Sequence, residues 1–129
     1  MKGIVSKIKG MPGFRMISGV SEEKIDEAEK ELGVRFAGEY RDYLSEFGVA
    51  TFEGHEFTGI CNSKRLNVVD VTKEERNLNP DIPEELYVVE RSNIDNAIIW
   101  QSPSGEIYQS IPNQKTMIIS ESLQDYIGK

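Results

Sequence analysis

Few residues of this 129-residue chain could carry out catalytic or metal chemistry. His55 is the only histidine, and Glu53, Glu56 and Cys61 are the nearest residues that could share a metal ion with it. A zinc site needs several such ligands at a defined spacing, which Glu53-Gly54-His55-Glu56 lacks. The sequence therefore predicts no metal site and a surface or strand position for His55.

Candidate nucleophiles are equally scarce. Cys61, the only cysteine, would need a base beside it, and its alternative is a buried, inert thiol. Ser102 and Ser104 belong to a turn sequence, not to the strand–elbow–helix context of a serine hydrolase. No glycine-rich phosphate loop is present. We therefore expect no catalytic residues, no cofactor and no enzyme activity; a small hydrolase using His55 with Cys61 or a carboxylate is the competing catalytic hypothesis.

Acidic side chains dominate the chemistry that the chain can offer. The 22 Asp and Glu residues exceed the 15 Lys and Arg residues, for a formal charge of −7. This balance argues against direct nucleic-acid binding, which depends on clustered basic residues. It suits either simple solvation or steering toward a basic partner. Charge alone selects these candidate partner-binding residues: Glu53, Glu56, Asp70, Glu74, Glu75, Asp81, Glu84 and Glu85.

Length and apolar patterning indicate one domain spanning residues 1–129. The first residues lack the apolar core of a signal peptide, and no run approaches the roughly 20 apolar residues of a membrane span. A single cysteine is typical of a reducing compartment. We expect a cytoplasmic protein with no membrane partner, present as a monomer or weak homodimer.

The clearest predicted element is a helix from Ser21 to Leu32. Ser21 can cap its start, and Ile25, Ala28 and Leu32 recur at helical spacing. Gly33 follows where a helix C-terminus favours a left-handed residue.

A second helix is predicted from Gly38 to Phe47. Tyr40, Tyr43, Leu44 and Phe47 form one apolar stripe, and Gly48 is expected to end the helix. This aromatic stripe needs a partner surface, most simply a sheet.

The remaining two thirds predict mostly short strands. Thr51 to Ile60 suggests one or two irregular strands, whereas Leu66 to Leu78 is ambiguous and favours a helix. Further strands are expected at 86–89, 97–100, 106–109 and 117–119, with a hairpin turn at 102–105 and a closing helix at 122–127. The fold class is therefore α+β: N-terminal helices packed on a mostly antiparallel sheet, with a short C-terminal helix.

Residues 21–48 resemble the signature of the SUKH superfamily. That signature is an acidic helix, a glycine, a hydrophobic–proline pair, then Tyr-x-x-Phe/Tyr-Leu and a closing glycine; the matching residues are Glu29, Gly33, Tyr40, Tyr43, Leu44 and Gly48. Ala37 stands where the family usually has proline. The rest of the chain resembles the second half of the family's sequence pattern more loosely. The similar segments there are residues 82–89, the hairpin around Gly105 and the closing helix.

The resemblance implies a SUKH-like fold and a role in toxin immunity. Bacterial members of this superfamily bind and block polymorphic or contact-dependent toxins, which are often nucleases, and relatives include the yeast cell-wall synthesis regulator. The implied partner is a cognate toxin protein with a basic, nuclease-like domain. The alternative implied by the same resemblance is a regulatory or scaffold adaptor that binds a host protein.

Overall fold

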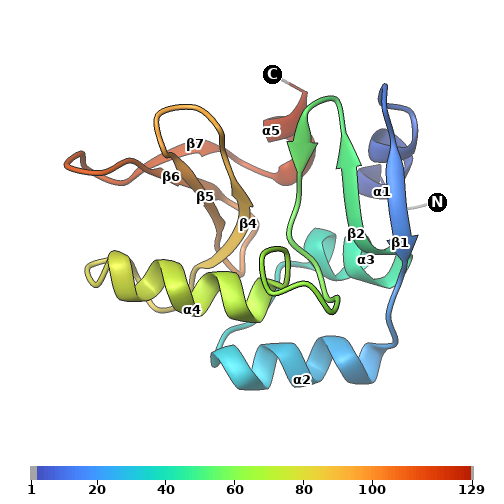
Figure 1. Cartoon of the computed structure of the whole chain (residues 1–129), viewed down its shortest axis with the longest axis horizontal. Helices are drawn as coiled ribbons and strands as arrows, with labels where there is room; N and C mark the ends of the chain where they lie inside the picture. The colour runs from blue at the N-terminus through green and yellow to red at the C-terminus, as the bar shows by residue number, and fades with distance from the viewer. Residues whose placement is uncertain (1–2, 129) are drawn as a thin grey trace.

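The computed structural model describes residues 3–128, which form helices along two antiparallel sheets (Figure 1). The helices are α1 (Gly3–Lys9), α2 (Glu22–Leu32), α3 (Gly38–Glu46), α4 (Val68–Leu78) and α5 (Leu123–Ile127). The strands are β1 (Arg15–Ser18), β2 (Phe47–Phe52), β3 (His55–Glu56), β4 (Tyr87–Arg91), β5 (Ile98–Gln101), β6 (Ile107–Ser110) and β7 (Met117–Ser120). The predicted α+β class with a short C-terminal helix is confirmed.

The two sheets have the orders β1-β2-β3 and β4-β5-β6-β7, and neighbouring strands are antiparallel. An antiparallel bridge between Phe57 and Glu90 joins them, and the Thr58 amide donates to the Val89 carbonyl at 2.9 Å. Figure 1 shows α2 and α4 along one side of the molecule, with the strands rising away from them. The chain segment after β3 thus connects both sheets.

Local sequence signals explain α2. The Ser21 hydroxyl accepts a hydrogen bond from the Lys24 amide, and Gly33 closes the helix with a left-handed φ of 68°. The Glu29 carboxylate then accepts the Phe36 amide at 2.8 Å, which fixes the approach to α3. The predicted helix is confirmed, including both caps.

The predicted end of the second helix is wrong. Phe47 and Gly48 begin β2 instead of ending α3. A Cβ atom at Gly48 would lie 2.7 Å from the Ser18 carbonyl oxygen and 3.2 Å from that of Ile60, so this glycine allows backbones to approach closely. Helix α1 and strand β1 were not predicted.

The later elements agree with the sequence. The segment 66–78, for which a helix was favoured, contains α4 (Val68–Leu78) capped by the Asn67 side chain, and β5 and β6 form the predicted hairpin. The strands β4 and β7 and helix α5 also lie where they were expected. Among residues 3–128, no helix is long and apolar enough to span a membrane.

The main core is aromatic, and its phenol groups are hydrogen-bonded. Tyr40, Tyr43 and Tyr87 are fully buried with Phe47 in a core to which the helices and both sheets contribute. The hydroxyl of Tyr43 accepts the Ala50 amide at 2.9 Å, and that of Tyr87 donates to the Gln101 side chain at 2.7 Å. These bonds satisfy polar atoms that burial would otherwise leave unpaired.

A second apolar cluster lies between α4 and the second sheet. It consists of Val71, Ile82, Leu86, Val88 and Trp100. This cluster holds α4 against β4 and β5, and so positions the acidic residues of α4 relative to the strands.

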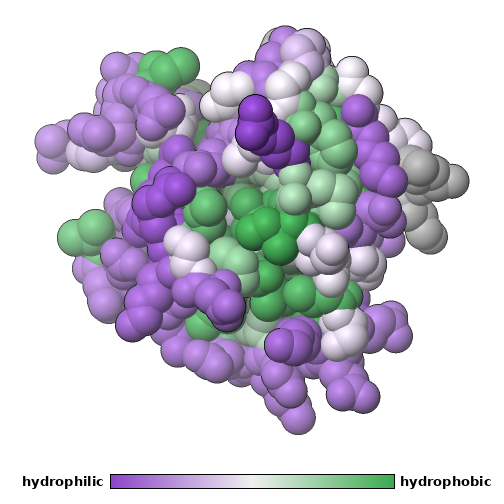
Figure 2. Space-filling model, turned by 45° about the vertical axis from the view of Figure 1, so that its right-hand side comes forward, coloured by the Kyte–Doolittle hydropathy of each residue, from purple (hydrophilic) through white to green (hydrophobic). Residues whose placement is uncertain are grey.

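One side of the molecule carries exposed apolar side chains. Figure 2 turns the β1 side forward and shows apolar residues gathered there inside a polar surround. Met16 and Ile17 of the edge strand β1 are 42% and 55% exposed.

Candidate functional site

Two adjoining pockets share Arg91 and Ser92 at the end of β4. Four of the eight predicted partner-binding residues lie in or beside these pockets: Glu53, Glu56, Glu74 and Glu75. The chain therefore brings together carboxylates that are about 20 residues apart in the sequence.

The first pocket, here called the Glu75 pocket, has a volume of about 620 Å³. Helix α4, the start of β5 and the segments that follow β4 and β6 supply its lining: Glu75, Leu78, Asn79, Arg91, Ser92, Asn96, Ile98, Ser110, Pro112 and Asn113. This mixture of apolar and polar groups is typical of a binding pocket.

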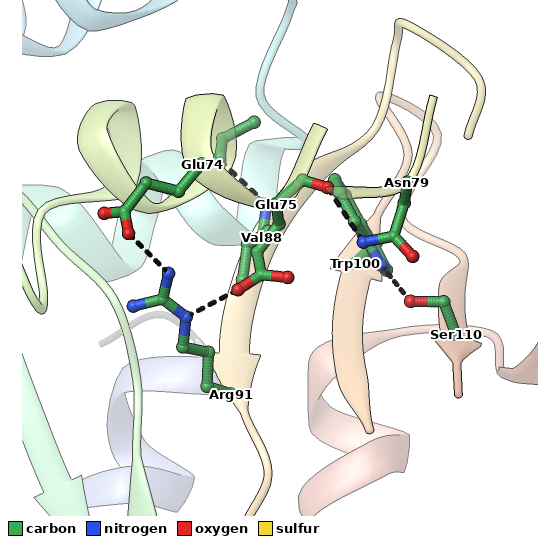
Figure 3. A network of polar contacts seen from close by, with 8 residues as sticks. Glu74, Glu75, Asn79, Val88, Arg91, Trp100 and Ser110 are labelled. Atoms are coloured by element: carbon green, nitrogen blue, oxygen red, sulfur yellow. Dashed lines mark hydrogen bonds and ion pairs between the residues drawn. The ribbon is translucent and has the colours of Figure 1, made fainter. Parts of the chain in front are cut away.

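An ion-pair network forms one wall of the Glu75 pocket (Figure 3). The Arg91 guanidinium donates from Nε to Glu75 at 2.8 Å and from Nη2 to Glu74 at 3.4 Å. Glu75 is only 7% exposed, whereas Glu74 is exposed. The predicted residue Glu75 therefore lies inside the fold and faces a pocket. Of these two neighbouring carboxylates, only that of Glu74 is on the exposed surface.

Neutral hydrogen bonds hold the other side of the same pocket. The Asn79 side chain donates to the Glu75 carbonyl at 2.8 Å, and the Trp100 indole donates to the Ser110 hydroxyl at 2.9 Å. Under the helix, the Val88 amide donates to the Thr72 hydroxyl at 3.0 Å. These bonds make the pocket a rigid part of the fold.

The second pocket, here called the His55 pocket, has a volume of about 280 Å³. Its lining includes the Glu90 carboxylate, which is buried and accepts hydrogen bonds from two elements, β3 and α5. His55 Nδ1 lies 3.0 Å from it, the Tyr126 hydroxyl donates at 2.6 Å, and the Glu56 amide donates at 3.3 Å. Strands β3 and β4 and helix α5 are thereby tied together.

Burial and charge change the acidity of this cluster. The hydrogen bond from His55 to Glu90 raises the pKa of the imidazole, because the carboxylate favours its protonated form. Burial, reinforced by the Glu90 charge, raises the pKa of the Tyr126 phenol. Both shifts in pKa favour the protonated forms of the two side chains, the imidazolium of His55 and the neutral phenol of Tyr126.

The cluster does not bring His55 and Cys61 together as a catalytic pair. His55 pairs with Glu90, while the Cys61 thiol lies 3.5 Å from the Ser63 carbonyl. Within residues 3–128, no group of three or more His, Cys, Asp or Glu side chains is placed to hold a metal ion. The arrangement is that of a structural polar cluster beside a pocket.

The Glu56 side chain of the His55 pocket pairs away from Glu90, and the four predicted residues outside the two pockets are dispersed. Glu56 forms a two-pronged ion pair with Arg65, which lowers the pKa of the Glu56 carboxyl. Asp70 lines a separate shallow pocket between α2 and α4. Asp81, Glu84 and Glu85 are exposed on the loop between α4 and β4. The eight residues do not form one continuous patch.

Sequence reasoning missed Arg91, Tyr126 and the buried role of Glu90. Arg91 and Glu75 are 16 residues apart, and Tyr126 and Glu90 are 36 apart. The one available signal was the position of Glu90 and Arg91 at the end of an apolar strand, where charged side chains are unusual.

The comparisons with known proteins give one family match. The family model described as SMI1-KNR4 cell-wall, of the SUKH group, matches residues 22–127. No curated protein matches the chain. The matched range includes every residue that lines the two pockets.

Proposed function

Because the chain belongs to the SUKH (SMI1-KNR4) family, we propose that it is an immunity protein that binds and neutralises a cognate toxin domain. The family is associated with toxin immunity, and its members are immunity or regulatory proteins that are generally not enzymes. The match over residues 22–127 is the observation that carries this proposal. A basic nuclease domain is the partner that we infer from charge.

The surface chemistry supports a basic partner. The chain has a formal charge of −7, and carboxylates line both pockets beside Arg91: Glu75 in one, and Glu53, Glu56 and Glu90 in the other. A nuclease must present basic groups to the phosphates of its substrate. An acidic protein that covers those groups would exclude the nucleic acid by occupying the same surface.

The direct test uses the toxin domain encoded beside this protein. We expect the two purified proteins to form a stoichiometric complex on size-exclusion chromatography, and we expect the complex to lose nuclease activity. Double substitution of the exposed Glu53 and Glu74 to Gln should weaken inhibition, whereas Glu22→Gln with Glu23→Gln on α2 serves as a charge-matched control. A toxin that neither binds nor loses activity would rule out the immunity role.

A regulatory adaptor is the second candidate, because the family description refers to the cell wall. An adaptor would recognise a host protein and would have no toxin gene beside it. Gene neighbourhood therefore separates the two functions. An adjacent toxin gene whose product is bound and inhibited would exclude the adaptor role as the main function.

A further inference from the structure

We propose that the Glu75 pocket receives one lysine or arginine side chain of the partner protein. This inference rests on the proposed function for the identity of the partner, but the chemistry of the pocket is independent of it. The pocket would thus hold a single cationic anchor, and such buried anchors contribute a large share of the binding energy of protein interfaces.

The first argument is a nearly buried carboxylate with an open oxygen. The Glu75 side chain is nine-tenths buried, and its Oε2 atom accepts the hydrogen bond from Arg91. Figure 3 shows the other carboxylate oxygen pointing away from Arg91. A carboxylate has acceptor capacity for more than one donor, and a cationic donor forms the strongest hydrogen bond with it.

Asn79 supplies a second acceptor. Its Nδ2 atom donates to the Glu75 carbonyl, which fixes the amide and leaves its Oδ1 atom for another donor. Glu75 lies in the last turn of α4, Asn79 follows the end of that helix, and both residues line the same pocket. An ammonium or guanidinium group offers several N–H donors, which suits a pocket lined by two acceptor side chains.

The local charge favours a cation over an anion. The carboxylates of Glu74 and Glu75 both pair with the single guanidinium of Arg91, so the network carries one excess negative charge. The Arg91 guanidinium is already engaged on two sides and is a poor receptor for an incoming carboxylate. A basic side chain would complete the neutralisation of the network.

The walls suit a long aliphatic stem. Leu78, Ile98 and Pro112 line the pocket, and Leu78 is 74% exposed at its margin. Lysine and arginine bury their methylene groups on apolar surface while their charged ends reach polar partners. A volume of about 620 Å³ accommodates one such side chain together with water.

The test uses small probes and the full chain, without the toxin. N-acetyl-lysine methylamide and N-acetyl-arginine methylamide are titrated while the Trp100 indole and Asn79 amide resonances are recorded. Trp100 is the only tryptophan and bonds to Ser110 in the pocket wall, so its signal is unambiguous. We expect saturable shifts with at least one cationic probe and none with the uncharged N-acetyl-norleucine methylamide.

Matched variants identify the pocket. Glu75→Gln should lower the affinity for the cationic probe by about tenfold or more, because it removes the charge of a buried acceptor. Glu84→Gln removes the same charge from an exposed loop and should leave the affinity unchanged. Leu78→Lys places a competing ammonium at the pocket margin and should abolish binding, whereas Leu78→Gln should retain it.

Three outcomes would overturn the inference: no shift with either cationic probe, equal shifts with the norleucine probe, or full affinity in Leu78→Lys. The Leu78 variants decide the matter even where Glu75→Gln does not fold, because Leu78 is exposed. A chain that binds the cationic probes but no toxin would reject the immunity role and keep the pocket. Toxin binding without probe binding would reject only the pocket.

Discussion

At the scale of single residues, Glu90 is the point at which three elements converge. Its carboxylate accepts hydrogen bonds from His55 on β3 and Tyr126 on α5, while its own backbone belongs to β4. A buried carboxylate is costly unless such donors satisfy it. The cluster therefore links the stability of the fold to the protonation of His55.

Substitution of His55 by Gln should have a pH-dependent effect on stability. The pKa of His55 is raised in the folded state above its usual value of about 6.5. Its stabilising contribution is thus fully present below the unfolded pKa and is lost as the pH rises through the folded pKa. In urea unfolding, the stability difference between wild type and His55→Gln should be largest at acidic pH and shrink above neutrality.

A stability difference between wild type and His55→Gln that stays constant from acidic to alkaline pH, or that grows as the pH rises, would contradict this prediction. Lys64→Gln, which replaces an exposed charged residue outside this cluster, provides the control and should show no comparable pH dependence.

Substitution of Tyr126 by Phe should destabilise the fold at neutral pH. The change removes one hydrogen bond to a buried carboxylate, and the expected loss in the free energy of unfolding is about 1–2 kcal/mol. Chemical denaturation of the two proteins measures it. Tyr108→Phe, on the partly exposed face of β6, is the matched control, and an equal effect of both changes would refute a special role for the Tyr126 hydroxyl.

The residue scale also limits what sequence can predict. Charge composition draws attention to acidic residues, but it does not distinguish the buried Glu75 from the exposed Glu74 beside it. That difference depends on Arg91, which reaches α4 from a strand that is distant in the sequence. Side-chain pairing across such separations has no local sequence signal.

At the scale of elements, two glycines allow the chain to pass close to itself. The Ile60 amide donates to the Gly48 carbonyl at 2.8 Å, so the segment after β3 lies directly against β2. A Cβ atom at Gly59 would collide with the backbone carbonyl of Gly48. The contact requires glycine because the obstacle is backbone and cannot rotate away.

Gly59→Ala should therefore unfold or severely destabilise the protein, with an expected loss above about 3 kcal/mol. Gly38→Ala is the control, because a Cβ atom there meets nothing within 4 Å and alanine favours the helix. Thermal unfolding of both variants measures the difference. A Gly59→Ala protein as stable as Gly38→Ala would show that the close approach is not required.

The elements divide clearly into predictable and unpredictable ones. Helix α2 has strong local signals in its Ser21 cap and left-handed Gly33, and its predicted bounds are correct to within a residue. In contrast, β1 is four residues long, exposed throughout and held by pairing with β2, which lies some 30 residues later. Gly48 led to the wrong prediction because glycine is favoured both at the end of a helix and where two backbone segments approach closely. The sequence alone does not distinguish these two positions.

At the scale of the whole molecule, net charge should govern how quickly the protein meets its partner. The formal charge of −7 produces a long-range field, whereas the pockets beside Arg91 act only at contact. Long-range steering accelerates association and is screened by salt. The association rate and the lifetime of the complex should therefore respond differently to ionic strength.

For the proposed toxin complex, we expect the association rate to fall roughly tenfold or more between about 0.05 M and about 0.5 M NaCl. The dissociation rate should change much less, because the buried contacts are poorly screened. Stopped-flow mixing or surface plasmon resonance measures both rates. An association rate that is insensitive to salt would show that the acidic surface does not steer the partner.

The narrow connection between the two sheets has a consequence for cooperativity. The bridge between Phe57 and Glu90 and the bond from the Thr58 amide to Val89 lie at the middle of the molecule, against the main core. This seam cannot open without separating both sheets, so the Thr58 amide should exchange with deuterium only through global unfolding. The outer strands β1 and β7 can fray independently, so protection should decrease from the seam toward both edges.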